Sequence, residues 1–218
     1  MKLDAATIQV LKNFSSINQS IMFKAGNVIR TISPSKTIMA RAILNQDFPA
    51  QFAVYDLSRF LGTISLFENP VLEIHEKHLD IIEGNNKFSY AFTDPSLIVV
   101  PPEKEINLAS AEVKFRLTGE ALHKVMRALG VASLPELAVT GKNGKIYLQA
   151  VDTRGTTNDV FSVEVGETSN TFRMIFRAEN IKLISGDYDV SISSKGLAYF
   201  KGDNIEYWVA VESNSSYE

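Results

Sequence analysis

The stretch Leu137-Ala-Val-Thr-Gly-Lys-Asn-Gly-Lys-Ile-Tyr-Leu-Gln-Ala-Val151 places two runs rich in apolar residues on either side of Asn143-Gly144. Apolar residues alternate with polar ones in these runs, as they do in strands that bury one face. Asn-Gly is the dipeptide that best suits a two-residue hairpin turn, because both central residues of that turn need a positive φ. The stretch therefore predicts an antiparallel β-hairpin.

Similar turn signals recur along the chain, at Ala25-Gly26-Asn27, Gly84-Asn85-Asn86 and Gly202-Asp203-Asn204. Each separates short runs of β-branched and aromatic residues, which is typical of strands. Helical spacing of apolar residues is limited to four short segments, 4–14, 56–66, 118–129 and 177–184. The predicted fold class is therefore α+β, with antiparallel sheet as the main component.

The two halves of the chain repeat the same order of elements. Val54-Tyr-Asp-Leu-Ser-Arg-Phe-Leu61 and Ile175-Phe-Arg-Ala-Glu-Asn-Ile-Lys182 each lead from a strand into a short helix. Leu79-Asp-Ile-Ile-Glu-Gly-Asn-Asn86 and Leu197-Ala-Tyr-Phe-Lys-Gly-Asp-Asn204 follow at similar distances. Internal repetition indicates repeated structural units. The sequence predicts two similar domains, 1–93 and 111–218, each with two short helices.

A connector is predicted over residues 94–110, between the two domains. Pro95, Pro101 and Pro102 lack backbone donors and disfavour a central strand there. The run Leu97-Ile-Val-Val100 is more apolar than a free linker, so we expect it to pack against a sheet.

Composition is that of an ordinary soluble globular protein, with 218 residues, 45% hydrophobic and 22% charged. The absence of cysteine excludes disulfides, thiolate metal sites and thiol nucleophiles. The first residues do not resemble a signal peptide, and no apolar run reaches the ~18–20 residues that span a bilayer. We expect a cytoplasmic protein.

The distribution of charge is uneven. A net charge of −3 argues against a simple basic nucleic-acid binder. The four helical segments nevertheless contain six basic and four acidic residues, and the acidic ones lie at the helix starts, where they complement the helix dipole. We expect a mildly basic surface if all four helices face the same way. The alternative is that these cations only solvate exposed faces.

No catalytic motif is present in the sequence. Gly141-Lys-Asn-Gly-Lys145 lacks the spacing and the following Ser or Thr of a phosphate-binding loop, and no Gly-x-Ser-x-Gly occurs. His75-Glu-Lys-His78 is the nearest approach to a metal-binding pair. In a strand, a separation of three residues puts the two side chains on opposite faces. We therefore expect a binding protein, without enzyme activity, metal or cofactor.

The sequence resembles the sliding clamps of T4-type bacteriophages in a set of collinear segments: Met1-Lys-Leu3, Leu11-Lys-Asn-Phe14, Tyr55-Asp-Leu57, Phe60-Leu-Gly62, Gly186-Asp-Tyr188 and Tyr207-Trp-Val-Ala-Val-Glu212. The resemblance covers essentially the whole chain and is strongest before residue 67. It implies a DNA polymerase processivity factor with the sliding-clamp fold. Three two-domain subunits would then close a six-domain ring around duplex DNA, with the helices lining the hole.

Carried over position by position, the resemblance implies a set of basic residues that face the duplex: Lys12, Arg59, Lys124, Arg127 and Lys182. Arg177 is left open, because it can still belong to a strand. Contacts to phosphates carry no sequence information, which suits a protein that slides. Outward-facing sheets with the remaining acidic charge would repel DNA.

The resemblance also implies partners: the C-terminal tail of the phage replicative polymerase, an ATP-driven clamp loader and the phage late-transcription factors. The tail would enter a pocket lined by Val99, Val100, Pro101, Tyr207 and Val209. Ordinary sheet packing is the alternative for these five residues. The expected location is the cytoplasm of an infected bacterium.

Two other functions remain open from the sequence. An oligomeric phage structural protein also favours repeated antiparallel domains, but it does not need positive charge concentrated on helices. An enzyme with an unrecognised site would show a polar pocket with perturbed titratable groups.

Overall fold

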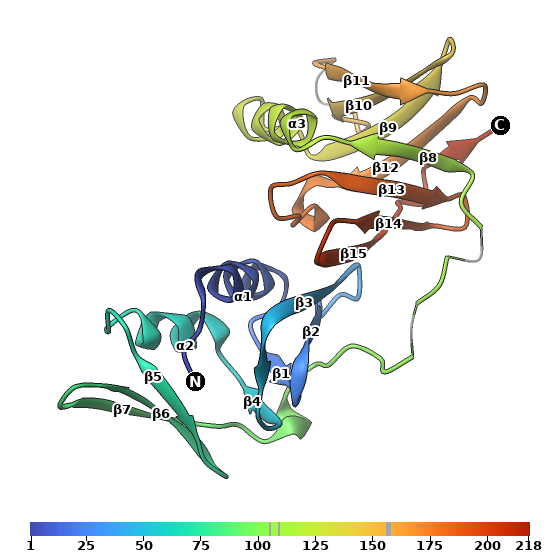
Figure 1. Ribbon diagram of the computed structural model, residues 1–218. Coiled ribbons are helices and arrows are strands. Elements are labelled where there is room, and N and C mark those ends of the chain that lie inside the picture. Colours follow the sequence, from blue (N-terminus) through green and yellow to red (C-terminus); the bar gives the residue numbers. More distant parts are fainter. Residues whose placement is uncertain (105, 109, 156–157) are drawn as a thin grey trace. The chain divides into compact units, whose positions relative to one another are not determined.

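The computed structural model describes residues 1–104, 106–108, 110–155 and 158–218, which divide into two compact units, Met1–Glu103 and Lys104–Glu218 (Figure 1). The boundary falls within the predicted connector 94–110, of which Glu105 and Ala109 lie outside the described residues. In the described part of the chain, every helix is too short or too polar to cross a bilayer.

The first unit combines two helices with short antiparallel ladders. Its elements are α1 (Ala5–Ile17), β1 (Ile21–Phe23), β2 (Gly26–Ile32), β3 (Ile38–Phe48), β4 (Phe52–Val54), α2 (Leu57–Ile64), β5 (Val71–Ile74), β6 (His78–Glu83), β7 (Asn86–Ala91) and a 3₁₀ turn at Pro95–Leu97. β1 pairs with β4, β2 pairs with β3, and β5, β6 and β7 form a three-stranded meander.

Both helices of the first unit begin at an aspartate, as predicted. Asp4 Oδ1 accepts a hydrogen bond from the Thr7 amide at 2.6 Å, and Asp56 Oδ1 accepts one from the Arg59 amide at 2.8 Å. Such caps satisfy amides that the first turn of a helix leaves without a partner. The hydrogen bonds from Thr7 also lower the pKa of Asp4. The expected starts of these helices are therefore confirmed.

The core of the first unit is rich in aromatic rings. Phe23 stacks on Phe52 with ring centroids 4.5 Å apart, and Phe48 lies 4.7 Å from Phe23. Phe60, on α2, meets Tyr90, on β7, in an edge-to-face contact at 5.2 Å. These contacts hold α2 against the strands and leave its polar side facing solvent.

The second unit contains one helix and two sheets. Its elements are β8 (Val113–Leu117), α3 (Gly119–Val131), β9 (Glu136–Lys142), β10 (Lys145–Val151), β11 (Phe161–Glu167), β12 (Phe172–Arg177), a 3₁₀ turn at Ala178–Asn180, β13 (Tyr188–Ser193), β14 (Leu197–Lys201), β15 (Ile205–Ala210) and β16 (Ser216–Tyr217). One sheet has the order β11-β10-β9-β12-β16, and β8, β13, β14 and β15 form another ladder. α3 packs on β9, β10 and β11.

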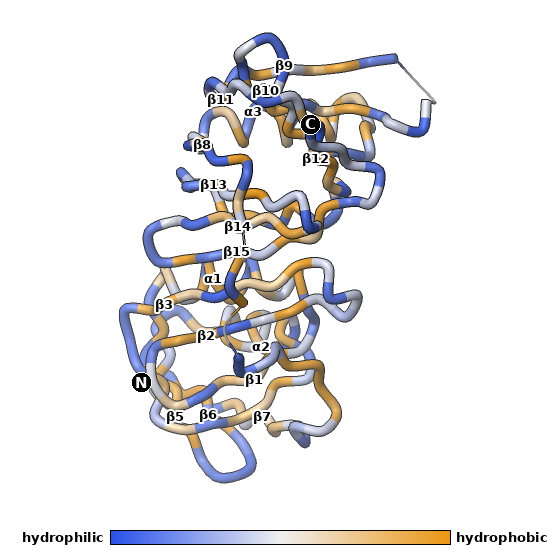
Figure 2. Tube along the Cα trace, turned by 90° about the vertical axis from the view of Figure 1, so that its right-hand side faces the viewer, coloured by the Kyte–Doolittle hydropathy of each residue, from blue (hydrophilic) through white to orange (hydrophobic). Residues whose placement is uncertain are grey.

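The hairpin predicted around Asn143-Gly144 is confirmed. β9 and β10 pair up to Lys142 and Lys145, and the two turn residues have φ of 53° and 83°. Figure 2 shows hydrophilic residues at several of the turns and hydrophobic residues along strands such as β9. The turn predicted at Ala25–Asn27 does not close a hairpin, because β1 belongs to the ladder with β4.

The prediction of a fourth helix at 177–184 is wrong. Only a single 3₁₀ turn forms in this segment, at Ala178–Asn180. Arg177 is the last residue of β12. Further along, the Ile184 amide donates to the Tyr207 hydroxyl at 3.1 Å, and the Tyr188 hydroxyl donates to the Ile184 carbonyl at 2.5 Å. The Tyr207 hydroxyl thus takes the Ile184 amide, which a helix over 177–184 would bond to the carbonyl four residues earlier. A segment this short gains too few helical hydrogen bonds to compensate for nucleation.

We expect Gly141→Ala to destabilise the second unit. A Cβ at Gly141 would overlap the Phe172 ring and lie 2.7 Å from the Asn170 carbonyl oxygen. Overpacking of this kind costs about 1–3 kcal/mol. The free energy of unfolding of Gly141→Ala, measured by urea denaturation, should be lower than that of the parent by this amount.

Gly62→Ala is the matched control, because Gly62 lies within α2 and its added Cβ would meet nothing within 4 Å. Alanine is the better helix former by about 1 kcal/mol, so this variant should be as stable as the parent or more so. Equal stability of the parent and Gly141→Ala would contradict the close packing described.

Candidate functional site

α1 and α2 each present a cation on the side away from the core. Lys12 is exposed, although its neighbour Leu11 is fully buried. Arg59 is exposed as well, and its guanidinium carbon lies 5.9 Å from the centroid of the Tyr90 ring. This cation–π contact orients Arg59 and leaves its charge accessible to solvent.

A cavity of about 230 Å³ lies beside Lys12 in the first unit. Its walls include Lys2 and Lys12 together with Leu61, Ile64 and Phe67. Residues of both α1 and α2 line this cavity, and the two helices contact each other.

α3 carries two cations, and their surroundings differ. The Lys124 amine lies 2.6 Å from a Glu120 oxygen, one turn earlier, and this contact lowers the pKa of Glu120. Arg127 is exposed, and among the described residues no carboxylate lies within ion-pair distance of it. Val125 and Leu129 are buried, as the predicted apolar stripe requires. The positive charge of Arg127 is therefore the more available of the two.

Lys182 and Arg177 do not lie on a helix. Lys182 is half-buried in the irregular segment that follows the 3₁₀ turn. The Arg177 guanidinium lies 3.2 Å from a Glu212 oxygen and 3.6 Å from a Glu179 oxygen, and these contacts raise its pKa. The basic face of the second unit therefore consists of one helix and a loop residue, where two helices were predicted.

The predicted connector exposes its apolar side chains. Leu97, Val99 and Val100 are 65%, 42% and 47% exposed, and Pro101 is half-buried. The expectation that this run packs against a sheet is wrong for these side chains. The backbone of this run accepts a hydrogen bond from Asn18 Nδ2 at the Val99 carbonyl, at 3.2 Å. An exposed apolar strip on a fixed backbone is suited to binding a partner.

Lys24 and Arg30, which sequence reasoning missed, hold the next part of the connector. The Lys24 amine lies 2.8 Å from a Glu103 oxygen, and an Arg30 nitrogen donates to the Glu103 carbonyl at 3.2 Å. More than 70 residues separate these partners in the chain, so no local pattern could have indicated the contacts.

Tyr207 and Val209 do not line an accessible pocket, which corrects the sequence prediction. Both side chains are fully buried. The Tyr207 ring packs against Tyr188 at 6.0 Å, and burial raises the pKa of both phenols, to about 12 for Tyr188. Strand β15 contributes these residues to the core, so ordinary sheet packing explains them.

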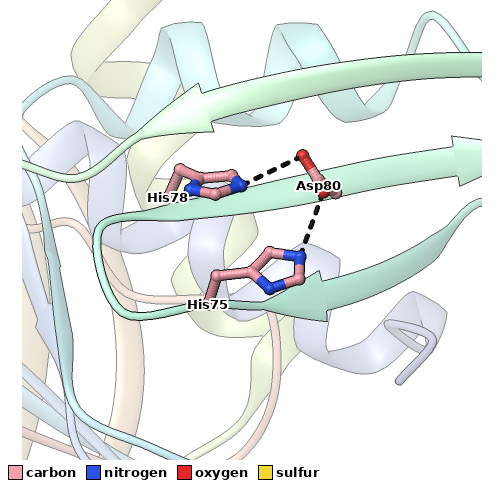
Figure 3. A group of neighbouring side chains, drawn as sticks. All are labelled: His75, His78 and Asp80. Atoms are coloured by element: carbon pink, nitrogen blue, oxygen red, sulfur yellow. Dashed lines mark hydrogen bonds and ion pairs between the residues drawn. The ribbon is translucent and has the colours of Figure 1, made fainter.

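His75 and His78 lie side by side, which also corrects the sequence prediction (Figure 3). The chain turns between β5 and β6, so the alternation of side chains within one strand does not apply. Each ring points a nitrogen at the carboxylate of Asp80. The structure thus brings together three metal-ligating side chains, of which the sequence analysis considered two.

Two family models match consecutive parts of the chain. The model described as DNA polymerase processivity factor matches residues 2–99, and the model described as gp45 sliding clamp, C terminal, matches residues 114–213. The sliding clamp of Vibrio phage KVP40 is 34% identical over 98% of this chain and 100% of its own length. The sliding clamp of Enterobacteria phage T4 is 30% identical over 100% of both chains.

A solved structure supports the fold independently of sequence identity. Archaeal PCNA from A. fulgidus, in a structure with the C-terminal region of FEN-1, matches with a TM-score of 0.70 at 14% identity, over 96% of each chain. At this identity the likeness shows the fold alone. The two-domain antiparallel architecture predicted from the sequence is confirmed.

Proposed function

The chain belongs to the sliding-clamp family of DNA polymerase processivity factors, and from this membership we propose that it closes a ring around duplex DNA and tethers the phage replicative polymerase there. The observation that carries the proposal is the likeness to phage sliding clamps over the full length of both chains. In this role the protein binds DNA and its partners, and it catalyses no reaction itself.

The proposed ring contains three chains and therefore six domains. In the described part of the chain, each unit has sheet edges available for pairing. β5 and β7 are the outer strands of the three-stranded sheet in the first unit, and β11 is an outer strand of the five-stranded sheet in the second. Unpaired edge strands are normally covered in native proteins. Head-to-tail pairing of an edge of one chain with an edge of the next would cover them and close the ring.

DNA would pass along the cations described above, namely Lys12, Arg59, Lys124, Arg127 and Lys182. Their support is the exposure of the first four and the family likeness, which includes α1, α2 and α3. Because the predicted fourth helix does not form, Lys182 is the member of this set whose assignment to DNA has the least support. Phosphate contacts would be exchangeable and salt-dependent, because the ring itself keeps the protein on the duplex.

The polymerase tail would bind at the connector, on the strip formed by Leu97, Val99, Val100 and Pro101. The exposure of this strip supports the assignment. The solved structure of A. fulgidus PCNA with the C-terminal region of FEN-1 shows that a protein of similar fold binds a C-terminal segment of a partner. We propose the same site for other clamp partners, an ATP-driven loader and late-transcription factors, in the cytoplasm of an infected bacterium.

Val100→Asp should weaken binding of a peptide that copies the polymerase tail by about tenfold or more. A carboxylate placed in an apolar contact without a partner is costly, because binding removes it from water. Fluorescence anisotropy of a labelled peptide gives the affinity. Primer extension by the polymerase in the presence of trap DNA gives the functional effect, namely shorter products with this variant than with the parent.

Val131→Asp is the control, since Val131 is 80% exposed at the end of α3, away from the connector in sequence. Its affinity for the peptide should equal that of the parent. If the parent does not lengthen the products of the polymerase at all, the proposed function is wrong. If it does and Val100→Asp binds normally, only the docking site is wrong.

A further inference from the structure

The turn between β5 and β6 stacks two imidazole rings. β5 ends at Ile74 and β6 begins at His78, and the His75 amide donates to the His78 carbonyl at 2.9 Å. The ring centroids of His75 and His78 lie 4.6 Å apart with an interplanar angle of 24°. The side chains are 43% and 42% exposed, so both rings remain accessible from solvent.

Asp80 lies behind the two rings, and its side chain is only 4% exposed. His75 Nε2 is 3.0 Å from Oδ2, and His78 Nε2 is 3.5 Å from Oδ1 (Figure 3). β7 adds two more contacts: the Lys87 amine lies 2.7 Å from Oδ2, and the Ser89 hydroxyl donates to Oδ1 at 2.5 Å. Hydrogen bonds, first from Lys87 and then from Ser89, lower the pKa of Asp80.

We propose that His75, His78 and Asp80 form a binding site for a divalent transition-metal ion, with Zn²⁺ as the best match. In the described part of the chain, this is the one group of three His, Cys, Asp or Glu side chains whose ligand atoms all lie within 4.8 Å of one another. Two imidazole nitrogens and one carboxylate oxygen are a donor set that Zn²⁺ accepts, with water or another ligand in the fourth position.

The spacing of the donor atoms fits a tetrahedral ion. With bonds of about 2.0–2.1 Å to nitrogen and oxygen, the donors of a tetrahedral site lie about 3.3 Å apart. His75 Nε2 lies 3.0 Å from Oδ2 and His78 Nε2 lies 3.5 Å from Oδ1, on either side of that value, and one ligand atom from each of the three residues lies within 4.8 Å of the others. Side-chain rotations would bring the two nitrogens and one carboxylate oxygen around the ion.

Lys87 acts as a competitor in this proposal. Its amine neutralises Asp80 in the metal-free chain and is itself 54% exposed. A bound ion would replace that charge at the carboxylate, and the lysine would move into solvent at little cost. Removing the lysine should therefore strengthen metal binding, although it removes a contact that stabilises the free protein.

A bound ion would cross-link the end of β5 to β6 at the turn that joins them. Any ligand that binds only the folded state raises its stability by mass action. The three residues of this site belong neither to the set of basic residues nor to the connector strip, and the proposal does not depend on the clamp function.

The test is titration of the metal-free full-length chain with Zn²⁺ by calorimetry, and with Co²⁺ by visible absorption. One ion per chain is expected, with the intense absorption of tetrahedral Co²⁺. His75→Gln and His78→Gln should each weaken binding by at least about tenfold, since even loss of a residue that supports a ligand costs that much. Both substitutions are at half-exposed positions, and thermal melts verify that the variants are folded.

Two further variants make the result decisive. His123→Gln, which removes the third histidine of the chain, on α3, should leave the affinity unchanged. Lys87→Met should tighten binding several-fold. Absence of Zn²⁺ binding at millimolar concentration, or equal affinity of His75→Gln and the parent, would overturn the site. Unchanged affinity for Zn²⁺ in Lys87→Met would contradict the proposal that Lys87 competes with the ion for Asp80.

Discussion

Replacement of both Lys124 and Arg127 by Glu is expected to reduce processive synthesis by about tenfold or more, because two cations proposed to face phosphates become anions. Both side chains are exposed on α3, so the core is untouched and stability should change by no more than ~0.5 kcal/mol. The length of primer-extension products, measured with trap DNA, gives the effect. Solution mass and thermal melts show whether the assembly and the fold are retained.

The single variants Lys124→Glu and Arg127→Glu should not reduce processive synthesis equally. Lys124 shares its charge with Glu120 at 2.6 Å, whereas Arg127 has no such partner among the described residues. Arg127→Glu is therefore expected to cause the greater loss. Lys142→Glu combined with Lys114→Glu is the charge-matched control, since these exposed lysines lie on β9 and β8. If the control double variant is as defective as the helix variant, net charge alone explains the loss, and the assignment of α3 to DNA is contradicted.

Phe161→Glu is expected to convert the proposed three-chain ring to single chains at low micromolar concentration. Phe161 begins the edge strand β11 and is 39% exposed, and Val160 beside it is 58% exposed. Apolar side chains at a sheet edge favour pairing with another strand. A carboxylate buried in that contact without a partner would cost several kcal/mol. Light scattering coupled to size exclusion measures the mass directly.

Val28→Glu is the control for this change, because Val28 has nearly the same exposure, 38%, on β2. Its mass should remain that of the parent. A parent protein that stays monomeric at high micromolar concentration contradicts the ring. A Phe161→Glu variant that remains trimeric removes β11 from the interface.

Local patterns predicted the parts of this fold whose geometry is set locally. Asn143-Gly144 specified its own turn through two positive φ values, and Asp4 and Asp56 capped the helices that they precede. The apolar stripe of α3 identified its buried face, and so placed Lys124 on the exposed side.

The predictions failed where distant residues decide the outcome. In the segment 177–184, where a helix was expected, the Ile184 backbone bonds instead to the hydroxyls of Tyr188 and Tyr207, of which the second lies 23 residues away. His75 and His78 meet because a turn, not a straight strand, joins them. Alternation within a strand likewise could not show that three consecutive residues of β15, Tyr207, Trp208 and Val209, are all buried.

Retention on circular against linear DNA tests the central claim most directly. The labelled chain is loaded with the phage's clamp loader and ATP on a nicked circular plasmid, and bound protein is separated by gel filtration at moderate salt. The account predicts that the protein stays on the circle and is released when a restriction enzyme linearises the same plasmid, because a ring can slide off an end. Equal retention on the circular and the linearised plasmid would contradict it.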